Sequence, residues 1–230
     1  MSNPVLLGVA HGSRNPAAQQ TIGALARQVR RLAPVLDVRV AFVQHAEPAL
    51  PDELAAAGPN TVVVPLLLST GYHLTTDITG AAASAGARLA GPLGPDTLLV
   101  TALAGRLAEA GVPDGTPVVL AAAGSADPAA AADAQRQASL LADRLEAPVT
   151  AAFASAARPR VADAVASLRA RTGRPVAVAT YLLAPGHFHD QLQRAGARWV
   201  TAPLGAHPAV AGLVIDRYRA ASRRPARAAA

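Results

Sequence analysis

Short apolar runs alternate with helical patterns along the chain. Four runs in the first half are mostly continuously apolar, which is typical of strands covered on both faces of a sheet. These runs span residues 4–10, 37–44, 60–69 and 87–93. A helical pattern follows the first run, with Asn15 predicted as N-cap, Pro16 at the first helical position and apolar residues at Ile22, Leu25, Val29 and Leu32. Strands alternating with helices predict a parallel, doubly wound sheet with right-handed crossovers.

The same pattern occurs twice. Four stretches of the first half recur in the second half in the same order, at offsets of 110 to 115 residues. The pairs are 11–18 with 123–130, 41–48 with 152–159, 63–73 with 178–188, and 86–94 with 196–205. We therefore expect an α/β fold of two tandem similar lobes, each a four-stranded parallel sheet flanked by helices. The expected bounds are 1–113, 114–222 for a degenerate second lobe, and 223–230 for an Arg/Ala-rich tail, with a ligand cleft between the lobes.

Missing residue types exclude several kinds of chemistry. The sequence has no cysteine, which removes disulfides, thiolate nucleophiles and cysteine-ligated metal sites. All 21 basic residues are arginines, so a P-loop lysine and Schiff-base catalysis are excluded too. A metal in this protein must therefore be held by nitrogen and oxygen.

The formal charge of +6 has three interpretations. Nucleic-acid binding is disfavoured, because the arginines are scattered outside the tail and only 3% of residues are aromatic. A solvated surface is the simplest interpretation, and an acidic small-molecule substrate is the next. No apolar run approaches the roughly 20 residues that a membrane span needs, and no basic segment precedes the first apolar stretch as in a signal peptide. We expect a cytoplasmic protein without membrane or nucleic-acid partners.

Two histidines follow predicted strands of the first lobe. His11 comes directly after the first strand, and His73 follows the third. In a sheet of order 2-1-3-4 these strands are neighbours, and ligands bind beyond the carboxyl ends of parallel strands. Two converging imidazoles could hold one divalent ion, but each histidine could equally be a hydrogen-bonded loop residue. Glycines stand near both corners, and the "GSR" at residues 12–14 is a weak signal for phosphate binding through backbone amides.

Residues after the second strand could add a third metal ligand. His45 and Glu47 are the candidates, and Glu47 could instead be an acid that favours the dipole of the following helix. In the second half, Ala123 stands opposite His11 and Phe188 opposite His73. The second half has three histidines of its own, for which surface or loop positions are the simpler interpretation: His187, His189 and His207.

The motifs resemble the sirohydrochlorin chelatases, which are class II tetrapyrrole metal chelatases of cobalamin and sirohaem synthesis. The resemblance covers nearly the whole chain, because long members of that family carry two such lobes in tandem. It rests on "HGSRNP", "FVQHAEP", "VPLLLSTGYH", "PLG" and the second-half "YLLAPG", at residues 11–16, 42–48, 64–73, 92–94 and 181–186.

The resemblance implies ATP-independent insertion of Co²⁺ or Fe²⁺, with Ni²⁺ as a further candidate, into sirohydrochlorin, a tetrapyrrole with eight carboxylates. It implies His11 and His73 as the catalytic and metal-binding pair, since neutral imidazole binds metal and accepts protons near neutral pH. Many members carry an acidic residue where this chain has Gln44, so Glu47 is our candidate third ligand. The substrate-binding candidates are Ser13, Arg14 and Gly71, with a surface salt bridge or simple turn roles as their alternatives.

Two rival functions remain at this point, and the chain is expected to be a monomer or a homodimer. One rival is a non-catalytic protein that binds or delivers a tetrapyrrole or a metal. The other is a phosphate-ester or nucleotide enzyme on the same doubly wound sheet, because a fold does not determine a function.

Overall fold

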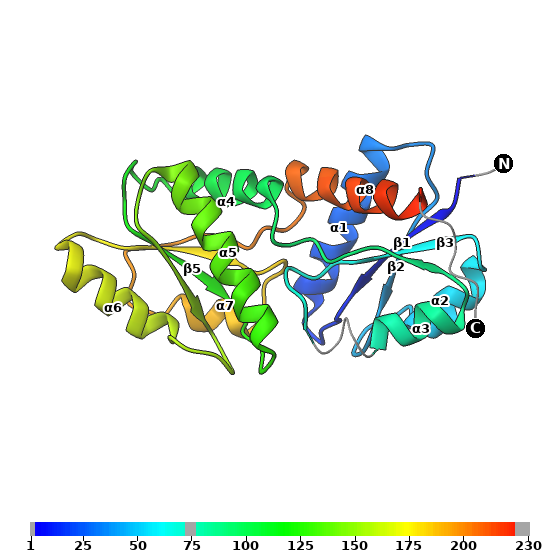
Figure 1. Ribbon diagram of the computed structural model, residues 1–230, viewed down its shortest axis with the longest axis horizontal. Coiled ribbons are helices and arrows are strands. Elements are labelled where there is room, and N and C mark those ends of the chain that lie inside the picture. Colours follow the sequence, from blue (N-terminus) through cyan, green and yellow to red (C-terminus); the bar gives the residue numbers. More distant parts are fainter. Residues whose placement is uncertain (1–2, 72–76, 224–230) are drawn as a thin grey trace. The chain divides into compact units, whose positions relative to one another are not determined.

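A computed structural model of the chain describes residues 3–71 and 77–223. It contains two compact units, Met1–Leu93 together with Gly205–Ala230, and Gly94–Leu204. Each unit has one four-stranded parallel sheet with helices on both faces (Figure 1). The predicted fold class is therefore confirmed.

The sheet of the first unit has the order β2-β1-β3-β4 and is parallel throughout. Its strands are β1 (Val5–Ala10), β2 (Val38–Phe42), β3 (Thr61–Pro65) and β4 (Arg88–Leu89). This is the expected 2-1-3-4 order, but the last strand is much shorter than the apolar run at 87–93. It pairs regularly with β3 at only two positions, although Ala90 and Leu93 beyond its end still donate to the carbonyls of Val63 and Leu67.

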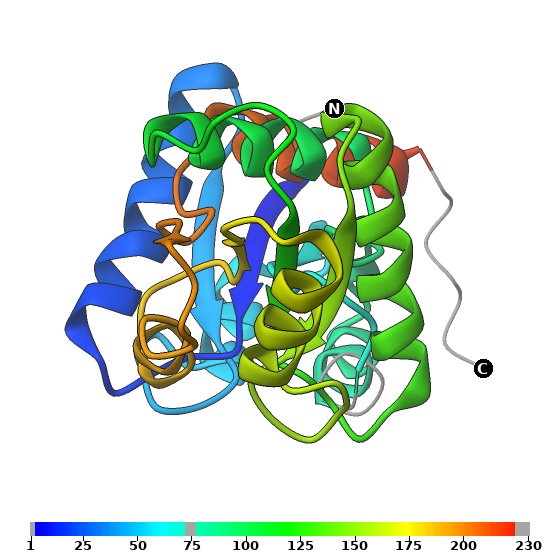
Figure 2. The same cartoon turned by 90° about the vertical axis from the view of Figure 1, so that its left-hand side faces the viewer.

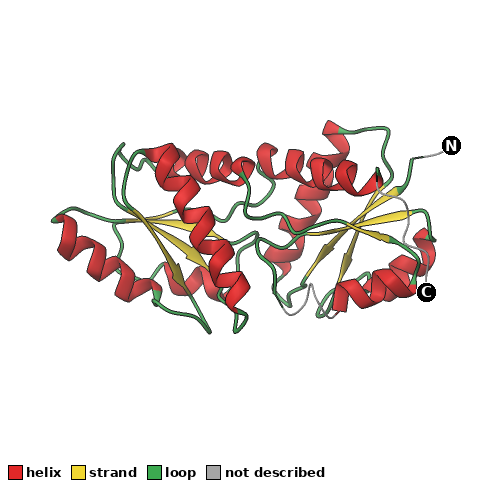
Figure 3. Ribbon diagram, viewed as in Figure 1, coloured by secondary structure: helices red, strands yellow, loops and turns green. Residues whose placement is uncertain are grey.

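Helices cover both faces of this sheet (Figure 3). On one face lie α1 (Pro16–Leu32) and α8 (Pro208–Ser222), and on the other lie α2 (Leu50–Ala57) and α3 (Thr79–Ser84). The predicted start of α1 is confirmed, since the side chain of Asn15 accepts the N–H of Ala17 at 2.9 Å. Leu32 lies at the end of the apolar stripe of α1 and is 50% exposed, because the helix ends there.

The second unit repeats this arrangement with the sheet order β6-β5-β7-β8 (Figure 2). The strands are β5 (Val118–Ala122), β6 (Val149–Phe153), β7 (Ala177–Tyr181) and β8 (Trp199–Val200). One face carries α4 (Thr97–Glu109) and α5 (Pro128–Leu145), and the other carries α6 (Val161–Thr172) and α7 (His187–Leu192). The side chain of Asp127 caps α5 as Asn15 caps α1, and Pro128 takes the place of Pro16.

The last helix of each sequence repeat belongs to the compact unit of the other repeat. Helix α4 ends the first repeat but packs against α5 and β7, whereas α8 ends the second repeat but packs against α1 and β3. Arg106 of α4 donates to the carbonyl of Leu204. Arg217 of α8 donates to the carbonyls of Pro92 and Leu93 at 2.7 and 2.8 Å.

The expected bounds at 113/114 and 222/223 therefore mark the sequence repeat, but they do not divide the compact units. Helix α4 covers the sheet of the second repeat and α8 covers the sheet of the first. The apolar pattern of a helix does not show which sheet it covers. Most of the expected tail, residues 224–230, lies outside the described residues.

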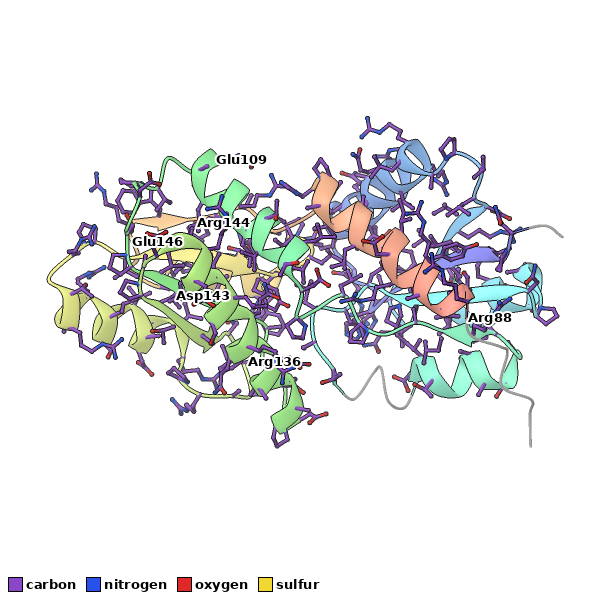
Figure 4. The ribbon with its side chains drawn as sticks, turned by 45° about the horizontal axis from the view of Figure 1, so that its top comes forward. Arg88, Glu109, Arg136, Asp143, Arg144 and Glu146 are labelled. Carbon is purple, nitrogen blue, oxygen red and sulfur yellow. The ribbon has the colours of Figure 1, made fainter. Side chains whose placement is uncertain are left out.

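Charged side chains of both signs lie on the outer surface. Figure 4 labels four exposed examples on or just after α5, which are Arg136, Asp143, Arg144 and Glu146. Arg88, also labelled there, joins β4 to the end of α8 by donating to the carbonyl of Ser222. It also donates to the side-chain oxygen of Asn60, which directly precedes β3. Within residues 3–71 and 77–223, no helix is long and apolar enough to cross a membrane.

Candidate functional site

His11 lies at a corner where the pairing of two neighbouring strands continues beyond their regular ends. The N–H of Val43 donates to the carbonyl of Ala10, and the N–H of Gln44 donates to the carbonyl of His11, both at 3.0 Å. Next in the chain is Gly12, with φ at +96°. A Cβ added at Gly12 would lie 1.6 Å from the carbonyl oxygen of Gln44, so only glycine fits there. The backbone thus holds the chain at His11 directly against Gln44.

The side chains of His11 and Gln44 also meet. Gln44 Nε2 lies 2.9 Å from His11 Nε2. An amide nitrogen only donates, so the imidazole Nε2 accepts and presents a lone pair at this point. The Nδ1 atom of the same ring is buried. In a neutral imidazole one nitrogen carries the proton, so this hydrogen bond places the proton of His11 on Nδ1.

The other residues predicted around this corner have different surroundings. Ser13 is a turn residue, since its Oγ accepts the N–H of Asn15 at 3.1 Å and its carbonyl accepts Gln19 Nε2 at 2.9 Å. Arg14 is exposed and Gly71 is partly buried. His73 lies outside the described residues, so the predicted pairing of His11 with His73 stays a prediction.

The loop between β2 and α2 carries the two candidates for a third ligand. His45 is exposed and has a left-handed backbone with φ at +61°. Glu47 is exposed, and its Oε2 accepts the N–H of Ala49 at 2.8 Å, directly before α2. This contact agrees with the alternative role of an acid at a helix N-terminus, but it occupies one carboxylate oxygen and leaves the other available. Residues 42–47 and Ala49 line a small hollow that is open to solvent.

Among the described residues, which do not include His73, no three histidine or acidic side chains lie close enough together to hold a metal ion. His11 therefore provides one nitrogen donor, and a complete metal site needs further donors. The chemistry available at the described corner is that of one oriented neutral imidazole beside a neutral amide.

The second unit has the same corner with different side chains. Ala154 and Ser155 donate to the carbonyls of Ala122 and Ala123 at 2.9 and 2.8 Å, as Val43 and Gln44 do in the first unit. Gly124 has φ at +93°, and a Cβ there would lie 2.0 Å from the carbonyl oxygen of Ser155. The loop backbone is matched as well, since both loops contain a cis proline peptide. The scaffold is thus duplicated, whereas His11, Gln44 and Glu47 correspond to Ala123, Ser155 and Arg158.

The histidines of the second repeat make local contacts. His187 Nε2 lies 2.7 Å from Gln191 Nε2, and His189 Nε2 lies 3.3 Å from the carbonyl oxygen of Thr201. His207 is not a plain loop residue, because it caps α8, with Nδ1 accepting the N–H of Ala209 at 3.1 Å. The available sequence signal for this helix start was Pro208 at the first helical position.

Tyr181 is the last residue of β7, at the carboxyl edge of the second unit's sheet. Among the described residues, its pKa is the most strongly altered. Burial raises the pKa of its phenol, and the nearby charges of Asp133 and Asp96 raise it further. The phenol therefore stays protonated at neutral pH and cannot act as a base there.

Sequence reasoning missed the contact between Gln44 and His11. It treated Gln44 only as the loss of an acidic residue, although the parallel pairing of the first two predicted strands already places their end residues side by side. Both residues follow the last paired positions, Ala10 and Phe42, by one and two residues.

Comparisons with known proteins agree with the duplicated fold. The CbiX family model matches residues 5–110 and again residues 117–221. The sirohydrochlorin ferrochelatase of Bacillus subtilis is 27% identical over 235 residues, which cover 93% of this chain and 90% of that protein. The sirohydrochlorin cobaltochelatase of Methanosarcina acetivorans is 29% identical over 79 residues, covering 33% of this chain and 61% of that protein.

A solved structure has a similar fold over nearly the whole chain. SirB from Bacillus subtilis with Fe³⁺ superposes with a TM-score of 0.82 at 26% identity, and the match covers 95% of each chain. Because the family model matches nearly the whole chain in two consecutive copies, this protein belongs to the CbiX family.

Proposed function

We propose that this chain inserts a divalent metal, Co²⁺ or Fe²⁺, into sirohydrochlorin without ATP. The family membership supports this reaction, since the ferrochelatase and the cobaltochelatase described above are relatives of the chain. The observation that carries the proposal is the His11 corner, where a neutral imidazole presents its Nε2 lone pair at the carboxyl edge of a parallel sheet. A cytoplasmic location belongs to the same proposal.

The reaction needs a donor that can hold a metal and then release it. The metal replaces two pyrrole protons of the macrocycle, so M²⁺ enters and two H⁺ leave. A neutral imidazole suits both halves of this exchange, because it binds M²⁺ through nitrogen and can accept a proton once the metal has moved on. In the proposal His11 and His73 form this pair, and the free oxygen of Glu47 supplies the third ligand.

The substrate carries carboxylates, and the proposal assigns their recognition to residues beside His11. Arg14 is exposed next to His11 and offers a guanidinium that can grip a carboxylate through two hydrogen bonds. Ser13 and Gly71 shape the approach of the macrocycle. Imidazole and carboxylate ligands suit Co²⁺, Fe²⁺ and Ni²⁺ similarly, so metal choice in the cell depends on availability as well as on the ligands.

The test is anaerobic metallation of sirohydrochlorin followed by absorbance, with Co²⁺, Fe²⁺ and Ni²⁺ each compared with the reaction without protein. We expect many equivalents of metallated product per protein with Co²⁺ or Fe²⁺. One equivalent or less, with tight binding of metal or tetrapyrrole, would instead indicate a binding and delivery protein. No acceleration with any of the three metals and no binding of sirohydrochlorin would exclude both functions.

A further inference from the structure

The hydrogen bond between His11 and Gln44 has a defined direction. The Gln44 amide can donate to Nε2 at 2.9 Å but, through its nitrogen, cannot accept from it. A carboxylate of the same shape would have the reverse effect, because it only accepts. In the observed orientation of the amide, with Gln44 Nε2 toward the ring, the proton of a neutral His11 therefore lies on Nδ1.

The backbone holds Gln44 next to His11. Gln44 is tied to His11 by its own N–H, and its carbonyl packs against Gly12, where a Cβ has no room. The matching corner of the second unit has the same backbone contacts, but Ser155 hydroxyl donates to the carbonyl of Ala123 at 2.9 Å. The amide-to-imidazole contact is thus specific to the first unit, whereas the loop that carries it is common to both.

We infer that Gln44 is a positioning residue for His11. Its amide holds the imidazole as the Nδ1–H tautomer and keeps the Nε2 lone pair oriented at the sheet edge. An incoming divalent metal takes the same lone pair, so it displaces the Gln44 amide when it binds. The inference rests on the proposed role of His11 as a metal ligand, but it makes a separate statement about the metal-free protein.

The hydrogen bond from Gln44 affects how His11 can take up and release a metal. The Nε2 lone pair accepts a hydrogen bond from a neutral amide and carries no proton. Metal binding to Nε2 therefore requires one hydrogen bond to break, and no proton has to leave Nε2. When the metal moves to the macrocycle, the amide can close again on the vacated nitrogen. Gln44 would in this way favour release as well as capture, which a cargo metal requires.

The first test reads the His11 tautomer by ¹⁵N NMR in the full-length protein without metal, at a pH about two units above the ordinary imidazole pKa of about 6.5. His11→Ala identifies the resonances of His11. We expect the Nδ1–H form to predominate in the wild type, the Nε2–H form in Gln44→Glu, and no wild-type bias in Gln44→Leu. Ser155→Ala, at the matching corner, should leave the His11 resonances unchanged. The same majority tautomer in the wild type and Gln44→Glu would overturn the inference.

The second test adds Zn²⁺ as a spectroscopically silent metal and follows the side-chain amide of Gln44. Zn²⁺ should shift this amide in the wild type and leave it unchanged in His11→Ala. If Zn²⁺ binds to His11 and the Gln44 amide does not respond, the amide is not displaced and the inference fails. Neither test contains tetrapyrrole, so a failure of metallation with both NMR results intact would reject the proposed function and retain the role of Gln44.

Discussion

Gly12 shows at the scale of one residue how the site depends on backbone geometry. Its φ of +96° and the carbonyl of Gln44 leave no room for a side chain. We expect Gly12→Ala to lower the free energy of unfolding by at least about 3 kcal/mol, since strained backbone and a steric clash add. Gly124→Ala should cost a similar amount in the second unit. Gly212→Ala is the control, because its Cβ meets no atom within 4 Å, and alanine is the better helix former.

These three variants are compared by urea unfolding. A loss below about 1 kcal/mol for Gly12→Ala would contradict the tight approach of the two loops, because the left-handed strain imposed on alanine alone costs about that much.

Glu47 has two possible roles that one substitution separates. Glu47→Gln keeps an oxygen for the N–H of Ala49 but removes the charge. If the second oxygen binds metal, Co²⁺ affinity should fall about tenfold or more, which corresponds to about 1.4 kcal/mol, with little change in stability. Asp52→Asn is the matched control, since Asp52 is an exposed acid in the first turn of α2. Calorimetric titration with Co²⁺ measures both. Equal affinities for Glu47→Gln and the wild type would leave Glu47 as a helix-terminal acid only.

At the scale of elements, the exchanged helix α4 is held to its unit by a buried amide. Gln137 of α5 is fully buried, and its side chain accepts the N–H of Asp96 at 2.9 Å and donates to the carbonyl of Asp96 at 3.2 Å. Gln137→Leu leaves both backbone groups without this partner, and we expect it to cost about 2 to 3 kcal/mol in unfolding free energy.

Gln135→Leu, on the exposed side of the same helix, serves as the control for Gln137→Leu and should change stability by less than about 0.5 kcal/mol. Urea unfolding monitored by circular dichroism compares the two variants. Equal stabilities would show that the amide does not hold the start of α4.

The elements also show where prediction from sequence succeeds and where it stops. The order of strands and helices, the cap at Asn15 and the duplication follow from local patterns, and the structure confirms them. The exchange of α4 and α8 does not follow, because a helix's apolar stripe shows that it covers a sheet but not which sheet. The predicted strand at 87–93 was too long for a related reason. Ala90 and Leu93 are buried and donate to the carbonyls of Val63 and Leu67, but they lie outside the regular strand.

The site was predictable to the extent that it depends on topology. His11 at the end of β1 and the proximity of the β2 loop follow from a parallel sheet, but the direction of the contact with Gln44 needed atomic positions. A sequence pattern predicts which residues lie next to each other at the end of a strand. Which of their atoms donate and which accept a hydrogen bond depends on the side-chain geometry.

For the whole molecule, the two units have the same corner and different chemistry. The first unit has His11 and Gln44, and the second has Ala123 and Ser155 on an equivalent backbone. Metal handling is therefore assigned to the first unit. His187 of the second unit is exposed and its Nε2 contacts Gln191 on the same helix, and it serves as the comparison.

The most direct test is the initial rate of Co²⁺ insertion into sirohydrochlorin by the wild type, His11→Ala and His187→Ala under anaerobic conditions. We expect the rate of His11→Ala to fall to the rate without protein and that of His187→Ala to stay within about twofold of the wild type, a difference of about 0.4 kcal/mol in barrier. Full activity in His11→Ala, or loss of activity in His187→Ala alone, would show that His11 of the first unit does not present the metal to the macrocycle.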